Sequence, residues 1–153
     1  MSHTAWRIVK AKLAPAAFDG EGAQRFGGRW NSKGTPMVYT AGSQALAVLE
    51  MLIHLEAGDL LERYRLISVK FDEALVRALD PKTLPANWKR RPTPTNIRAV
   101  GDAWVASGES VVLQVPSVIV PGESNYLLNP LHRDFAKLAI GKAQPFRFDP
   151  RLK

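Results

Sequence analysis

Cysteine is absent from this chain of 153 residues, which excludes disulfides and metal sites built on thiolates. Histidine is scarce, and the three that occur (His3, His54 and His132) are too far apart to show the spacing of zinc ligands. We therefore expect no bound metal and a mechanism that needs neither a metal nor a thiol. A chain without cysteine also fits a reducing compartment.

Long apolar runs are missing as well. No uncharged apolar stretch reaches the roughly 18 residues that a membrane-spanning helix needs. The N-terminal segment lacks an apolar core of signal-peptide length. We expect a cytoplasmic protein without a membrane partner. The chain also lacks internal repeats and low-complexity tracts. With 46% hydrophobic and 23% charged residues, it is expected to form one globular domain over residues 1–153.

Acidic residues are outnumbered, 14 against 21 lysines and arginines, which gives a net charge of +7. Such a charge attracts phosphate-bearing ligands, nucleic acid or an acidic protein. The basic residues are scattered, apart from a local cluster at 89–91 (Lys-Arg-Arg). No helix-turn-helix, zinc finger or aromatic-basic RNA-binding motif accompanies this charge, so direct nucleic-acid binding is not the leading expectation. A basic nucleic-acid-binding or adaptor domain stays open as an alternative.

Short apolar runs predict strands at residues 6–9, 37–40, 65–71, 110–115, 118–120 and 146–148. Helices are predicted over 43–57, with Ser43 as N-cap and Gly58 as the stop, and from 95 or 96 to 107, stopped by Gly108. A third, shorter helix is expected over 130–138. Between the first two helices, residues 80–94 form a loop with four prolines. Because strands and helices do not alternate regularly, we predict a single α+β domain with a mixed or antiparallel sheet.

The predicted helix over 43–57 is apolar nearly all round, which favours a central position in the fold. Its narrow polar stripe holds Ser43, Ala47, Glu50 and His54. In one interpretation this stripe meets water at a sheet edge. In the other, Glu50 lines a pocket, because a buried carboxylate is costly unless it is paired or functional.

Four further residues are candidates for a site. Arg29 lies in a glycine turn, GGRWN, where its fork could hold phosphate or carboxylate, or simply be solvated. Tyr39 could offer an aromatic face to a ligand ring, or fill the edge of the core. Ser117 and Asn125 belong to a polar cluster among apolar strands, where asparagine commonly fixes a turn. No GxSxG elbow supports a serine hydrolase.

The order of these motifs (GGRWN, VYTA, the helix from Ser43 through Glu50, VPS and ESNYLLNP) resembles the RES domain, the toxin family of RES–Xre toxin–antitoxin pairs. The resemblance runs from Trp6 to about Phe148 and matches nothing between Pro81 and Pro94. It implies a fold similar to that of the diphtheria-toxin-type ADP-ribosyltransferases. By matching motif, the catalytic and substrate-binding residues implied are Arg29, Tyr39, Glu50, Ser117 and Asn125.

The resemblance also implies a function. A RES toxin is expected to arrest growth by cleaving the nicotinamide–ribose bond of NAD, which is its substrate, with no cofactor. Within the family, the alternative is an ADP-ribosyltransferase that modifies a specific host protein. The residue types suit either reaction, because a carboxylate near the ribose stabilises the oxocarbenium-like charge that cleavage develops. The implied partner is a cognate Xre-type antitoxin, in a hetero-oligomer with the toxin. The acceptor of ADP-ribose stays open between water, phosphate and a protein.

Overall fold

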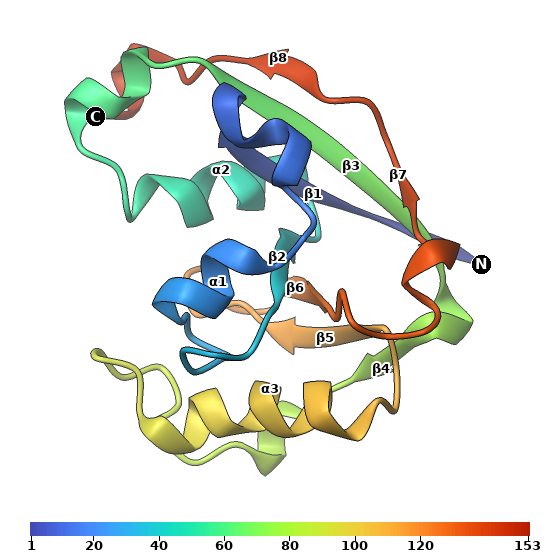
Figure 1. Cartoon of the computed structure of the whole chain (residues 1–153). Coiled ribbons are helices and arrows are strands. Elements are labelled where there is room, and N and C mark those ends of the chain that lie inside the picture. Colours follow the sequence, from blue (N-terminus) through green and yellow to red (C-terminus); the bar gives the residue numbers. More distant parts are fainter.

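One curled sheet organises the computed structural model, which describes all residues from 1 to 153 (Figure 1). Its strands follow the order β4-β5-β6-β2-β1-β3-β7, and β8 also pairs with β3. The strands are β1 (Ser2–Lys10), β2 (Val38–Ala41), β3 (Tyr64–Asp72), β4 (Val76–Ala78), β5 (Val112–Pro116), β6 (Ser124–Leu128), β7 (Ala139–Ile140) and β8 (Gln144–Phe146). Only β4 and β5 are parallel, so the predicted mixed sheet in an α+β domain is confirmed.

The sheet has two halves that meet along a narrow seam. β1 and β3 pair along their whole length, from Ser2 opposite Asp72 to Lys10 opposite Tyr64. In the other half, β6 pairs with both β2 and β5. The halves join where Trp6 of β1 lies opposite Ala41 of β2. Because the pairing across this seam is so short, the two halves diverge from it (Figure 1).

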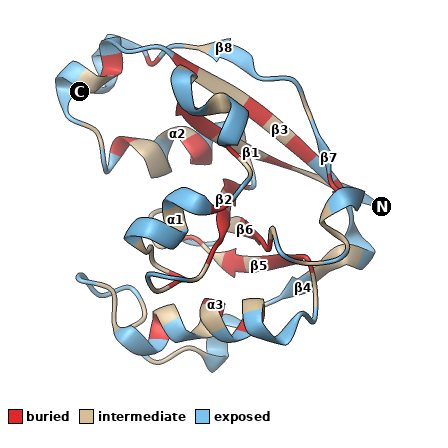
Figure 2. Cartoon of the chain, viewed as in Figure 1, coloured by how far each residue is buried: buried red, intermediate tan, exposed pale blue.

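Three helices cover this sheet: α1 (Glu21–Phe26), α2 (Gln44–Leu52) and α3 (Thr95–Ser107). The buried side chains of α2 pack on β1, β3 and the C-terminal Phe148, whereas those of α3 pack on β5 and β6. Buried residues accordingly follow the strands and the inner faces of these two helices (Figure 2). No helix is long and apolar enough to cross a membrane.

Two helix boundaries predicted from local chemical signals are confirmed. Ser43 caps α2, because its hydroxyl accepts a hydrogen bond from the Leu46 amide at 3.0 Å. α3 ends where Gly108 adopts a left-handed conformation with φ of 63°, as the glycine stop predicts. The strands predicted at 6–9, 37–40, 65–71 and 110–115 all overlap strands of the sheet.

Other predicted boundaries are wrong. α2 ends at Leu52 and not at 57, because Glu56 and Asp59 form a capping box that begins a separate 3-10 turn, in which Gly58 is no stop. Residues 118–120 bend and form no strand, since the Ser117 hydroxyl captures the amides of Ile119 and Val120.

Three further elements differ from the prediction. Residues 130–138 contain only the 3-10 turn Phe135–Lys137 and no longer helix. The helix α1 was not predicted at all. Ser124–Leu128, expected as a polar cluster among strands, is the inner strand β6 of the sheet. β6 is an inner strand because it pairs with β2 on one side and β5 on the other, and no local sequence pattern predicts this pairing.

The central position predicted for the Glu50 helix holds for one face only. Leu46, Ala47 and Leu52 of α2 are buried, but Leu49 and Ile53 are 40% and 46% exposed. The helix is apolar nearly all round, yet the sheet covers only its inner face and nothing in the chain covers the outer one. Glu50 itself is half-buried, so it is not the fully buried charge that the apolar run suggested.

Candidate active site

The turn that carries Arg29 follows α1 and is held by a buried asparagine. Gly27 takes φ of 75° and the Gly28 amide bonds to the Asn31 carbonyl at 3.0 Å, which closes the turn. A Cβ on Gly28 would lie 2.6 Å from the hydroxyl oxygen of Tyr39, so only glycine fits there. The fully buried Asn31 amide donates to the carbonyls of Ala23, Ser32 and Thr35. The turn is therefore rigid, not flexible.

Tyr39 positions this turn through its hydroxyl. It donates to Asn31 Oδ1 at 2.6 Å and accepts the Trp30 amide at 3.0 Å. Burial raises the pKa of Tyr39 well above its usual value, and the hydrogen bond from Trp30 only partly opposes this shift. At neutral pH the phenol is thus a neutral hydrogen-bonding group, fixed against the two residues that follow Arg29.

Arg7 on β1 supports β2, the strand that carries Tyr39. Its Nη1 donates to the Tyr39 carbonyl at 3.0 Å and its Nε to the Ala17 carbonyl at 2.7 Å. Burial lowers the pKa of Arg7 to about 10, and Asp19 acts weakly in the opposite direction. A half-buried arginine whose donors bond to backbone carbonyls is a structural support for β2. Sequence reasoning gave it no role.

The Arg29 side chain reaches across to the proline-rich segment. Its Nη1 donates to the carbonyl of Trp88 at 3.0 Å and to that of Arg90 at 3.4 Å. Partial burial lowers the pKa of Arg29, and the positive charge of Arg91 adds to this effect. Glu50 opposes it, so the charges of Arg29 and Glu50 act on each other across the site. The guanidinium remains cationic and keeps other donors for an anion.

Glu50 is held by two polar side chains from the other half of the sheet. Asn125 Nδ2 on β6 donates to Glu50 Oε2 at 2.5 Å, and the Ser117 hydroxyl donates to the same oxygen at 3.3 Å. Ser117 is 2% exposed, and its oxygen already accepts two backbone amides, which directs its single proton to Glu50. Oε1 of Glu50 has no partner within the chain. It is the oxygen left to face a ligand.

The structure thus brings the five predicted site residues into two groups. Glu50, Ser117 and Asn125 form one hydrogen-bonded cluster, although 67 and 75 residues separate Glu50 from its two partners. Arg29 and Tyr39 form the second group, joined through the turn between them. Neither group contains three or more His, Asp or Glu side chains placed to hold a metal ion, nor does any other part of the chain.

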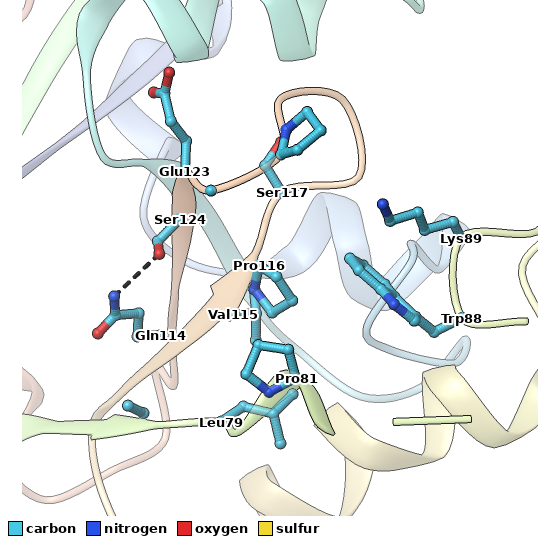
Figure 3. Close-up of a pocket in the computed structure, with 13 residues that line it drawn as sticks. Leu79, Pro81, Trp88, Lys89, Gln114, Val115, Pro116, Ser117, Glu123 and Ser124 are labelled. Carbon is cyan, nitrogen blue, oxygen red and sulfur yellow. Dashed lines mark hydrogen bonds between the residues drawn. The ribbon is translucent and has the colours of Figure 1, made fainter. Parts of the chain in front are cut away.

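A cavity of about 320 Å³ opens beside the first group (Figure 3). One wall is formed by Pro116 and Ser117 at the end of β5, and the facing wall by Trp88 and Lys89. Sequence reasoning gave Trp88 no role and considered Lys89 only as part of the basic cluster at 89–91. The only signal there was a tryptophan within a segment rich in proline and lysine or arginine.

Comparisons with known proteins identify the family of this chain. The family model of the RES domain matches residues 4–149. The chain belongs to the RES domain family. It is 39% identical to a protein of Yersinia enterocolitica named Toxin Res, over 150 residues that cover 97% of this chain and 98% of that one. It is 40% identical to the Prs ADP-ribosylating toxin of Sphingobium sp., covering 99% and 98% of the two chains.

The RES fold is also seen in a solved structure. A chain from the M. tuberculosis MbcT-MbcA toxin-antitoxin complex superposes with a TM-score of 0.79, covering 99% of this chain and 87% of that chain. At 24% sequence identity, this likeness concerns the fold alone. A closer likeness to the diphtheria-toxin-type ADP-ribosyltransferases stays a prediction.

Proposed function

We propose that this RES domain chain is the toxin of a toxin–antitoxin pair, and that it consumes NAD by breaking the bond between nicotinamide and ribose. The observation that carries the proposal is the Glu50 carboxylate. One of its oxygens is fixed by Asn125 and by Ser117, which also lines the cavity, and the other has no partner within the chain. A carboxylate aimed in this way suits a reaction that develops positive charge on a sugar ring.

The reaction proceeds by loss of the ring. The bond between the ribose C1′ and the nicotinamide nitrogen breaks, and its electron pair leaves with the ring, which becomes neutral. Positive charge then spreads over C1′ and the ribose oxygen, where Glu50 stabilises it. An oxygen nucleophile attacks C1′ and loses its proton to Glu50 or to solvent. In this proposal Arg29 binds the pyrophosphate or a ribose, and Ser117 and Asn125 orient Glu50 and contact the ribose.

Tyr39 takes a positioning role in this scheme. Its hydroxyl is hydrogen-bonded to Asn31 and to the Trp30 amide, so it fixes the position of the turn that carries Arg29. The Tyr39 ring is half-buried, so only its exposed part can stack on the substrate.

A second candidate function, ADP-ribosylation of a host protein, is favoured by the name of the Sphingobium relative. Both reactions start with the same bond cleavage and differ only in the acceptor of ADP-ribose. A basic nucleic-acid-binding or adaptor domain would instead place function in residues 89–91. It would show salt-sensitive DNA binding and leave NAD intact.

The deciding experiment is incubation of the purified chain with NAD, with products followed by mass. Release of nicotinamide together with free ADP-ribose, or with its phosphate ester, supports NAD degradation. Release of nicotinamide only when a host lysate is added, with ADP-ribose attached to one protein, supports the second candidate. Intact NAD under both conditions refutes the proposal.

We also propose a cognate Xre-type antitoxin as partner, in a hetero-oligomer within the cytoplasm. Support comes from the relatives named Toxin Res and from the toxin-antitoxin complex that contains the structural neighbour. The proposal predicts an adjacent gene for a helix-turn-helix protein; co-expression of that protein should restore growth, and the two proteins should co-purify.

A further inference from the structure

The indole of Trp88 is fixed next to the Glu50 cluster by contacts on two sides. Its backbone carbonyl accepts the hydrogen bond from Arg29, and its ring lies against Trp30 with centroids 6.2 Å apart and planes tilted by 36°. Trp30 is itself buried in the core. Although Trp88 belongs to an otherwise irregular proline-rich segment, its ring therefore has a defined place relative to the turn that presents Arg29.

The ring lines the same cavity as Ser117. Figure 3 shows Trp88 and Lys89 across the cavity from Pro116 and Ser117. Ser117 in turn donates its proton to Glu50 Oε2, so it belongs both to the cavity wall and to the carboxylate cluster. A cavity of about 320 Å³ lies at the lower end of the range for small-molecule sites. Ser117 thus connects this cavity to the carboxylate cluster, although Glu50 itself is not one of the lining residues.

A cation already occupies the face of the Trp88 ring. The Lys89 ammonium lies 5.4 Å from the ring centroid, a distance at which the ring quadrupole attracts positive charge. Lys89 is exposed and forms no ion pair with a carboxylate in the structure. Since nothing else holds its side chain in place, Lys89 can leave the ring at little cost and be replaced by another cation.

We propose that Trp88 is a specificity-determining residue that recognises the positively charged pyridinium ring of NAD, which takes the place of Lys89 over the indole. This inference rests on the proposed function for its choice of substrate. It assigns to residues 88 and 89 the selection of the oxidised dinucleotide, because the nicotinamide ring of NADH carries no charge and is not attracted in this way.

The nicotinamide ring loses its positive charge during the reaction, so its contact with Trp88 affects substrate binding and bond cleavage differently. Before cleavage the pyridinium is cationic and attracted to Trp88. After cleavage nicotinamide is neutral, and the attraction ends. The contact therefore favours binding of NAD and release of nicotinamide, and it does not accelerate bond breaking. Replacement of Trp88 by leucine should raise KM about 2- to 30-fold and leave kcat within a few-fold of wild type.

Two small probes test the charge preference without relying on NAD turnover. 1-Methylnicotinamide is a cation and nicotinamide is neutral, while both share the ring and the carboxamide. Binding of each is measured by NMR titration, with thermal melting to verify that every variant is folded. The wild-type protein should bind the cation about 2- to 30-fold more tightly than the neutral ring. Trp88→Leu should reduce this ratio to near one, and Trp88→Phe should keep part of it.

Two further variants serve as comparisons: one at Lys89, which should strengthen probe binding, and one at Asn87, which should not change it. Lys89→Gln removes the group that either probe displaces and the charge that repels the cation, so it should strengthen binding of both probes, and of 1-methylnicotinamide more. Asn87→Ala alters an exposed neighbour outside the cavity wall and should change neither. A purely structural role for Trp88 would weaken both probes equally in Trp88→Leu. That result, or equal or absent binding of the two probes to wild type, would overturn the inference.

Failure of this inference can be distinguished from failure of the proposed function. If wild type consumes NAD but the probe ratio does not respond to Trp88→Leu, the function stands and the recognition by Trp88 is wrong. If the ratio responds as expected but NAD stays intact, the cavity selects cationic rings and the proposed reaction is wrong.

Discussion

Neutralising Glu50 without changing its shape is the most direct test of the site. In Glu50→Gln, the amide oxygen can still accept the hydrogen bonds from Asn125 and Ser117 that Oε2 accepts now. The new amide group takes the place of Oε1, which has no partner in the chain. Since Glu50 is half-buried and sits on a capped helix, we expect the fold to survive with a melting temperature within about 2–4 °C of wild type.

The loss of activity can be estimated from the lost charge interaction. Two unit charges about 4 Å apart attract by about 4 kcal/mol at the effective dielectric constant near a protein surface. Partial exposure of Glu50 reduces this value. We therefore expect a loss of rate at the low end of the roughly 10²- to 10³-fold range that is typical when one electrostatic contact to the transition state is removed. The expected result is NAD turnover about 10²-fold below wild type.

The assay compares NAD turnover and thermal melting of the same protein samples. Glu62→Gln is the matched control, because Glu62 is an exposed glutamate whose ion pair with Lys10 lies outside the site. It should keep full turnover. A folded Glu50→Gln protein with turnover close to wild type would refute the assignment of Glu50 to the reaction.

Three further predictions concern the turn. Arg29→Lys should lower kcat/KM at least 10-fold, because lysine lacks the planar fork that bonds the Trp88 carbonyl and an anion together; near-normal kinetics would leave Arg29 a merely solvated residue. Gly28→Ala should destabilise the fold by about 1–3 kcal/mol, measured by urea unfolding, since its Cβ meets the Tyr39 hydroxyl; an unchanged midpoint would contradict that crowding. The raised pKa of Tyr39 stabilises the fold fully below about pH 10, and this contribution is lost as pH rises towards the folded-state pKa. The free energy of unfolding should therefore fall more steeply above pH 10 in wild type than in Tyr39→Phe, and parallel curves would exclude this linkage.

The parts of the fold that were predictable from sequence depend on a few neighbouring residues. Ser43 caps α2 through an amide three residues away, and Gly108 ends α3 by its own backbone conformation. Where a competing local bond was overlooked, the prediction failed. The hydroxyl of Ser117 captures two following amides, and so residues 118–120 bend instead of forming a strand.

The sequence by itself indicated the α+β class, the family resemblance and the five candidate site residues. It could not indicate that β6 is an inner strand, that one face of α2 stays exposed, or that Arg7 and Asn31 support the site. Nor could it pair Glu50 with Ser117 and Asn125, or bring Trp88 to the same cavity. These features depend on contacts between segments that lie tens of residues apart, and packing of the whole sheet selects them. A cap or a stop is determined by bonds within one turn of chain, whereas a site assembled across two halves of a sheet exists only once those halves have met.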